Sequence, residues 1–227
     1  MPDIDSISTR APLHQRTVGG RLRAIARLDP DRAALVAGDQ EYSATFADLL
    51  EQTGLAARGL MATGVERGDR VAIWASERYE STVLGLAAAR TGAILVAIDP
   101  ECDAAELGDG LAATGARLLA MSRGSRAVDR GELLEQARGR CPWLRSVVML
   151  DGEWHAFLEE GAHVSACELA AREALVGLGD DVCAWPVALT HRELLAGGDN
   201  VAPAPGLGAL NVILRGARVF LPNRGFA

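Results

Sequence analysis

The sequence contains no lysine, and all 23 of its basic residues are arginine. Alanine and glycine are abundant, so a GC-rich coding sequence is the simplest origin of this bias. Its chemical consequence is independent of that origin. No side-chain ammonium is available to form a Schiff base, to accept an acyl group or to contact a phosphate as a compact point charge.

Aromatic residues make up only 4% of the chain, so a core must be built mainly from alanine, valine, leucine and isoleucine. The four cysteines form no Cys-x-x-Cys pair, which argues against a structural zinc knuckle. No stretch approaches the roughly 20 apolar residues of a membrane span. Residues 1–16 are polar and lack the apolar centre of a signal peptide. These absences predict a cytoplasmic protein with reduced cysteines and no membrane span.

Acidic residues outnumber basic ones, 30 to 23, for a formal net charge of −7. The arginines are spread along the chain instead of being clustered. A basic surface for nucleic acid is therefore not expected, and nucleic acid is not predicted as a partner.

Strand and helix patterns alternate along most of the chain. Short apolar runs predict strands at residues 70–75, 93–98, 117–121 and 146–150, and a hairpin at 34–37 and 41–43. Predicted helices cover residues 17–27, 78–90, 104–114, 129–138, 153–160 and 166–175. Thr45, with Asp48 three residues later, caps a further helix that ends near Gly64, and Thr190 with Glu193 forms a capping box. Residues 197–208 read as a loop, and 217–221 as a final strand.

Continuous apolar strands are typical of a sheet that is covered on both faces. We therefore expect an α/β fold with a mostly parallel sheet and helices on each side. Three parts are predicted: an N-terminal arm at residues 1–16, an α/β domain at 17–182 and a shorter segment at 183–227.

Five segments in a fixed order carry a family resemblance. They are Thr45-Phe46-Ala47-Asp48-Leu49 after Tyr42, Gly64-Val65-Glu66-Arg67-Gly68-Asp69-Arg70-Val71, Arg90-Thr91-Gly92-Ala93 through Asp99-Pro100, Glu106 through Leu119, and Cys141-Pro142. Each alone is a turn or a core element, but in this order they resemble the adenylate-forming enzymes of the acyl-CoA synthetase type over residues 28–181. The resemblance implies an incomplete version of the N-terminal domain of those enzymes. It concerns scaffold and not chemistry.

The same resemblance implies a phosphate loop rich in Thr, Ser and Gly and ending in Pro-Lys-Gly. In the family this loop lies between an Asp-Asp pair and a Val-x-Leu-Thr-His-Arg segment. Both flanks are present, at residues 180–183 and 187–195, but only Ala184, Trp185 and Pro186 stand between them. About a dozen residues of a phosphate-binding loop are missing relative to the family pattern. Trp185 is expected to be a packing plug at this shortened junction.

A second gap follows Asn200. The adenine-binding segment, the metal-binding Glu, the ribose-binding Asp and the C-terminal domain with its catalytic lysine are expected beyond Ala227. We therefore assign no catalytic, cofactor-binding or metal-binding residue. No cofactor is expected to bind tightly, and ATP, Mg²⁺ and CoA are implied only if the family activity is retained.

Three interpretations stay open, and whether the chain is an enzyme is uncertain. The first is a degenerate, catalytically inactive acyl-CoA synthetase-like protein, a truncated pseudoenzyme derived from fatty acid metabolism. The second is an AMP-forming fatty acid–CoA ligase completed by a second chain. The third is a non-catalytic interaction module, a homo-oligomer or a partner of another chain that covers exposed apolar surface.

Other chemistry has weaker support in the sequence. His155, His163 and Cys167 have loose spacing for metal ligands and no evident fourth ligand. Gly206-x-Gly208 lacks the third glycine of a dinucleotide fingerprint. His191 and Arg192, at the start of a helix, either contact an anion or solvate the helix end. Glu159-Glu160 and Asp180-Asp181 are expected to be surface charges.

Overall fold

The computed structural model describes residues 16–38, 41–123, 129–185, 188–196 and 207–221. Their centre is a six-stranded sheet in the order β6-β5-β3-β4-β7-β8. The strands are β3 (Arg70–Trp74), β4 (Ile94–Ala97), β5 (Leu118–Met121), β6 (Ser146–Met149), β7 (Asp181–Trp185) and β8 (Leu189–Thr190). Every neighbouring pair is parallel except β7 and β8, so the predicted, mostly parallel sheet is confirmed.

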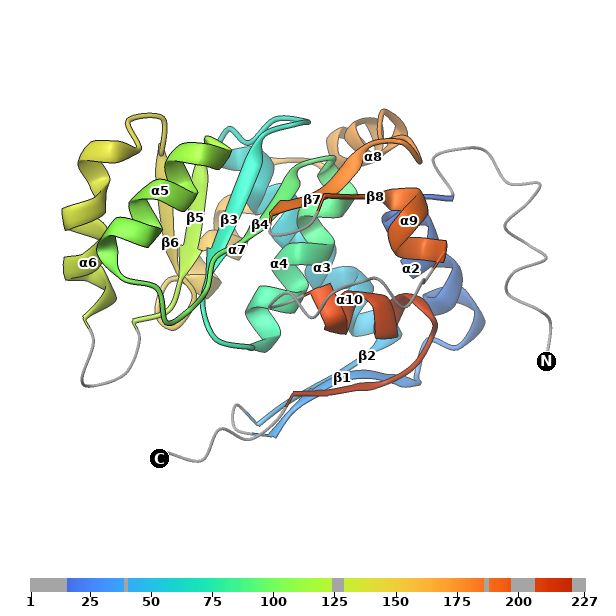
Figure 1. Ribbon diagram of the computed structural model, residues 1–227. Coiled ribbons are helices and arrows are strands. Elements are labelled where there is room, and N and C mark those ends of the chain that lie inside the picture. The colour runs from blue at the N-terminus through green and yellow to red at the C-terminus, as the bar shows by residue number, and fades with distance from the viewer. Residues whose placement is uncertain (1–15, 39–40, 124–128, 186–187, 197–206, 222–227) are drawn as a thin grey trace.

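Helices cover both faces of this sheet (Figure 1). On one face lie α3 (Phe46–Ala62) and α4 (Tyr79–Thr91), and on the other α5 (Ala104–Thr114) and α6 (Arg130–Ala137). Successive strand residues point to opposite faces, so β3 sends Val71 and Ile73 into one core and Ala72 and Trp74 into the other. This double burial explains the continuous apolar strands of the sequence.

The helix α4 lies at the centre of the molecule, and residues 80–91 are all buried. It packs against α3, α2 (Val18–Leu28), α8 (Ala166–Ala174) and α10 (Leu207–Leu214). Gly92 ends it with a φ of 75°, a left-handed conformation that favours glycine. A Cβ at Gly92 would also lie 2.9 Å from Arg67 Cγ, so this turn has no room for a side chain.

A second, three-stranded sheet has the order β2-β1-β9. The strands β1 (Ala33–Ala37) and β2 (Tyr42–Thr45) form the predicted antiparallel hairpin, and β9 (Val219–Leu221) joins β1 in parallel. The remaining helices are α7 (Trp154–Glu160), α9 (His191–Ala196) and the short 3-10 helices η3 (Arg138–Arg140) and η4 (Gly161–His163).

Local boundary signals were confirmed at most helices. Thr45 and Asp48 form a reciprocal capping box at the start of α3, and α5 has the predicted bounds. Two predictions need correction. The sequence predicts a loop at residues 207–208, but these residues belong to α10, and its patterns do not predict the strands β7 and β8. Residues 1–15 and 197–206, and the side chain of Trp185, lie outside the described residues, so the arm, the rest of the loop and the packing role of Trp185 stay predictions.

Candidate functional site at the β7–β8 hairpin

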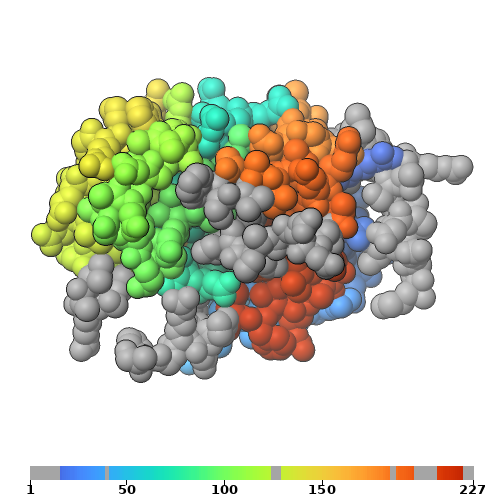
Figure 2. Space-filling view, in the orientation of Figure 1, coloured from blue at the N-terminus to red at the C-terminus, as the bar shows by residue number. Residues whose placement is uncertain are grey.

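The candidate site is the edge of the sheet where the two flanks of the expected phosphate loop meet. On one side β7 pairs with β4, and on the other it pairs antiparallel with β8 through Asp181↔Thr190 and Cys183↔Leu189. Residues 186–188 are all that joins the two strands. Figure 2 shows the surface around β7, β8 and α9 (orange) above α10 (red) on one face of the molecule.

The carboxylate before β7 is already bonded. Arg67 donates to Asp180 through Nε, 3.0 Å from Oδ2, and through Nη2, 2.8 Å from Oδ1. Partial burial would raise the pKa of Asp180, but the N–H of Gly177 and the Arg67 guanidinium outweigh burial, and the pKa is lowered. Asp180 therefore attaches the loop that precedes β7 to the turn before β3. Asp181, Glu159 and Glu160 are exposed, as expected for surface charges.

The start of α9 offers few free donors to an anion. Thr190 donates to the Glu193 carboxylate from its N–H and its hydroxyl, each at 2.8 Å, and the Glu193 N–H donates back to Thr190 Oγ1 at 3.3 Å. The predicted capping box is confirmed. Hydrogen bonds from the Thr190 backbone lower the pKa of Glu193, so its charge already faces the positive end of this six-residue helix.

His191 differs from both of its predicted roles. Its side chain is fully buried, so it neither contacts an anion in solvent nor solvates the helix end. Its Nδ1 accepts a hydrogen bond from the N–H of Val18, at 3.2 Å. Arg192 is exposed. Sequence reasoning missed the burial because the partner of His191 lies 173 positions away along the chain.

A second candidate location is the edge of the sheet at the carboxyl ends of the parallel strands. After β3 the chain turns into α4 on one face, and after β5 it turns into α6 on the other, which makes a topological switch point of the type that often binds ligands. Here Trp74 is fully buried and donates from Nε1 to the carbonyl of Asp99 at 3.0 Å.

Arg130 completes the packing at these strand ends. Its guanidinium lies 5.2 Å from the centre of the Trp74 ring. It donates to Ser122 Oγ at 2.7 Å and to the carbonyl of Pro100 at 2.9 Å. The Trp74 and Arg130 side chains thus bond to Ser122 Oγ and to the carbonyls of Asp99 and Pro100 at this edge. No local pattern marked this cluster, because its members come from four separate segments.

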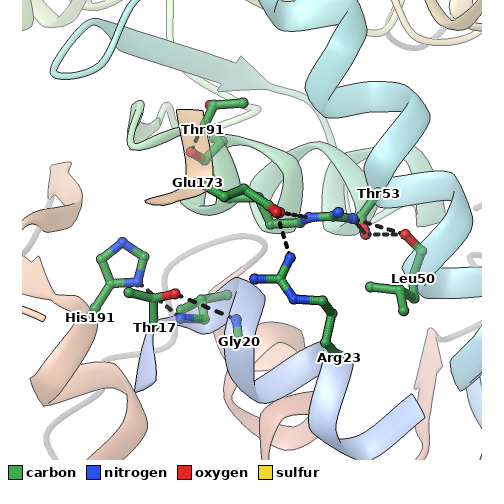
Figure 3. A network of polar contacts seen from close by, with 11 residues as sticks. Thr17, Gly20, Arg23, Leu50, Thr53, Thr91, Glu173 and His191 are labelled. Carbon is green, nitrogen blue, oxygen red and sulfur yellow. Dashed lines mark hydrogen bonds and ion pairs between the residues drawn. The ribbon is translucent and has the colours of Figure 1, made fainter. Parts of the chain in front are cut away.

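The buried charged cluster of the molecule joins four helices (Figure 3). Arg90 of α4 donates from Nε to Glu173 of α8 at 2.7 Å, and from Nη1 to Thr53 Oγ1 at 2.7 Å and the Leu50 carbonyl at 2.8 Å, both in α3. Arg23 of α2 donates to the second oxygen of Glu173. Burial lowers the pKa of Arg90, and the Glu173 carboxylate opposes that effect.

This cluster has a structural role. The hydrogen bonds of Arg90 go to groups of the protein, and the Glu173 carboxylate is shared between two guanidinium groups. A Cβ on Gly19 would lie 3.0 Å from Arg90 Cγ, so the small residue lets α2 approach the arginine closely. The arginine of the third family-like segment therefore holds helices together, and no substrate is needed to explain it.

The residues considered above as metal ligands do not form a site within the part of the chain that the structure describes. His155, His163 and Cys167 are all exposed. Within the described ranges, no three His, Cys, Asp or Glu side chains are grouped so that they could hold a metal ion. In the same part of the chain, no helix has the length and apolar character needed to cross a membrane.

This arrangement matches a known protein family. The family model described as AMP-binding enzyme matches residues 22–185. The chain belongs to the AMP-binding enzyme family. The match begins within α2 and ends at the last residue of β7, immediately before the connection to β8.

Curated relatives within the family are coenzyme A ligases. The mitochondrial medium-chain acyl-CoA ligase ACSF2 of Bos taurus is 35% identical over 130 residues, which is 57% of this chain and 21% of that protein. A methyl-dioxo-octahydroindenyl-propanoyl:CoA ligase of Mycobacterium tuberculosis is 35% identical over 170 residues, 73% of this chain and 32% of that protein. The chain thus spans between a fifth and a third of these relatives.

Solved structures establish the fold. The N-terminal domain of FACL13 from Mycobacterium tuberculosis matches with a TM-score of 0.71 and 21% identity, over 90% of this chain and 56% of that chain. A fatty acyl CoA synthetase of the same organism matches with a TM-score of 0.74 and 19% identity, over 93% of this chain and 46% of that one. The predicted fold, the N-terminal domain of an acyl-CoA synthetase, is confirmed.

Proposed function

We propose that this chain is a degenerate acyl-CoA synthetase-like protein that keeps the family scaffold and does not adenylate a carboxylic acid by itself. The observation that supports this proposal is the spacing at the sheet edge, where only residues 186–188 join β7 to β8. The division into residues 17–182 and 183–227 and the cytoplasmic location belong to the same proposal.

A phosphate cradle needs several consecutive backbone N–H groups that converge on one anion, with hydroxyl or ammonium donors beside them. A three-residue connection between paired strands has little backbone to spare for this purpose. The chain also has no lysine to supply an ammonium group. Losing one preorganised donor costs about 2.7–4 kcal/mol of transition-state stabilisation. Losing several would remove much of the roughly 8–23 kcal/mol that an enzyme provides.

The alternative is an AMP-forming ligase that uses ATP, Mg²⁺ and CoA and is completed by a second chain. Its support is the 35% identity to two proteins that are named as CoA ligases. This alternative requires donors that come from outside residues 180–195.

The proposed homo-oligomer or partner chain is tested separately, by light scattering over a range of concentrations.

Calorimetric titration with ATP and Mg²⁺ tests the proposal directly. The positive control is the Mycobacterium tuberculosis propanoyl:CoA ligase that is 35% identical to this chain. We expect no saturable binding at micromolar concentrations and no pyrophosphate release on mixing with fatty acid, ATP and CoA. Micromolar binding with one site per chain would refute the proposal.

A loop graft identifies the cause. In one variant, residues 186–188 are replaced by a Thr, Ser and Gly-rich segment of family length that ends in Pro-Lys-Gly. Its matched control carries a segment of equal length made only of Gly and Ala. If the short connection is what prevents nucleotide binding, the first variant gains affinity for ATP and the second does not. Equal affinities in the two variants would mean that the connection is not the cause.

A further inference from the structure

The buried imidazole of His191 joins two distant parts of the chain. His191 is the first residue of α9, and Val18, whose N–H it accepts, is the first residue of α2. Figure 3 shows the ring beside the start of α2, next to Thr17. The Thr17 side chain caps the same helix by accepting a hydrogen bond from the N–H of Gly20, at 3.4 Å. The start of α2 therefore depends on two acceptors, and one of them is a titratable ring.

The hydrogen bond defines the state of the ring. Because Nδ1 accepts, the proton of the neutral ring is on Nε2. Nε2 is buried and has no hydrogen-bond partner within the part of the chain that the structure describes. A second proton on Nδ1 would set an N–H against the N–H of Val18. It would also place a full positive charge at the positive end of the α2 dipole.

We propose that His191 forms an acid-sensitive contact between two helices. Its neutral ring holds the start of α2 against α9, and protonation of the ring releases the start of α2. The middle of α2 stays attached through the ion pair of Arg23 with Glu173, so the release is local to the first turns of the helix.

Among the residues that the structure describes, the charged groups on the surrounding elements do not neutralise an imidazolium at this place. Asp180 is the carboxylate that attracts it, and that carboxylate is bound to Arg67. Other charged groups on adjacent elements are engaged or exposed: Arg21 with the carbonyl of Leu214, Glu193 with Thr190, Arg215 with Asn211, Glu173 with Arg23 and Arg90, and Arg192 exposed. Burial lowers the pKa of His191 to about 4 against the opposing effect of Asp180.

Hydrogen exchange of the α2 amides between pH 7 and pH 4.5, corrected for intrinsic exchange rates, tests the proposal. We expect protection of Val18 and the next turn to fall at least tenfold, while the amides of β3 and β5 stay more strongly protected than those of α2. In His191→Asn, the Oδ1 atom takes the place of Nδ1 and does not titrate, so protection of α2 should not vary with pH. His163→Asn, at an exposed position, is the matched control and should behave as the wild type.

Constant protection of Val18 in the wild type would overturn the proposal, as would the same loss in His191→Asn. If His191→Asn does not fold, the ¹⁵N shifts of the wild-type ring replace it. They should report the Nε2–H tautomer at pH 7, and an imidazolium that forms together with the loss of protection. The other tautomer, or protonation without opening of α2, would contradict the proposal.

Discussion

The central sheet and the β7–β8 hairpin belong to one fold but differ in the roles that their family-like residues play. Around the central sheet, family-like segments have visible structural tasks, such as the cap at Thr45, the helix junction at Arg90 and the turn at Gly92. At the hairpin, the flanking segments persist with their own local bonds, yet three residues connect them. Under the proposed function, the residues that determine the fold and the residues that bind a ligand are separable, and this chain keeps the first without the second.

The largest expected difference between the two regions is in their arginines. Arg90→Leu leaves the buried Glu173 carboxylate and the Leu50 carbonyl short of a donor. We expect the free energy of unfolding to fall by about 3–5 kcal/mol, measured by urea denaturation.

Arg67→Leu, the matched variant beside the hairpin, removes an ion pair with Asp180 that is much more exposed. Its cost should stay within about 1 kcal/mol. Equal losses in the two arginine variants would remove the energetic distinction between the regions.

The next largest effect is the pH dependence of the free energy of unfolding, which His191 at the start of α9 should produce. The pKa of His191 falls from the ordinary value of 6.5 to about 4 in the folded protein, so the unfolded chain binds the proton first. The resulting stability is present above pH 6.5 and is lost as the pH falls toward 4. At about 1.4 kcal/mol per pKa unit, the loss at pH 4.5 is on the order of 2–3 kcal/mol.

Urea midpoints at pH 7, 6, 5 and 4.5 measure this loss, and the difference from His191→Asn removes the contribution of the carboxylates. A wild-type protein that loses no more stability than the variant would show that the ring titrates normally.

Close packing in the first region gives a smaller effect. A Cβ on Gly161 would lie 2.6 Å from the backbone nitrogen of Gly59 and 2.9 Å from the carbonyl of Leu55. Gly161→Ala should therefore cost about 1–3 kcal/mol in thermal or urea unfolding. Gly139→Ala is the control, since nothing lies within 4 Å of a Cβ there, and it should cost nothing. A neutral Gly161→Ala would mean that α3 and η4 separate easily.

The smallest effect belongs to the helix cap. Thr45→Ala removes the hydroxyl that accepts from the N–H of Asp48, at 3.2 Å. We expect a loss of about 1 kcal/mol in urea denaturation. Ser43→Ala, two residues earlier and exposed, should change little. A Thr45 variant as stable as this control would exclude the cap as a determinant of the α3 boundary.

Local chemistry made part of this structure predictable. The caps at Thr45 and Thr190, the turn at Gly92 and the buried strands all follow from patterns of fewer than ten residues. The strand β7 was missed because the pattern around Cys183 is short, and its identity as a strand depends on pairing with Leu95, far away in the sequence.

The buried polar residues were beyond local patterns for the same reason. The role of His191 depends on Val18, and that of Arg130 on groups after β4 and β5. One signal was available for Arg90, because an arginine that directly follows a run without polar side chains, Val83 to Ala89, needs a buried partner. The identity of that partner, Glu173, required the packed structure.

Thermal melting with and without ATP and Mg²⁺, and with a hydrolysis-resistant acyl-adenylate mimic, tests the central claim most directly. A ligand that binds only the folded state must raise the midpoint. If the hairpin has lost its grip on phosphate, the midpoint stays the same with either ligand. A rise that grows with ATP concentration would show that the protein still binds the nucleotide.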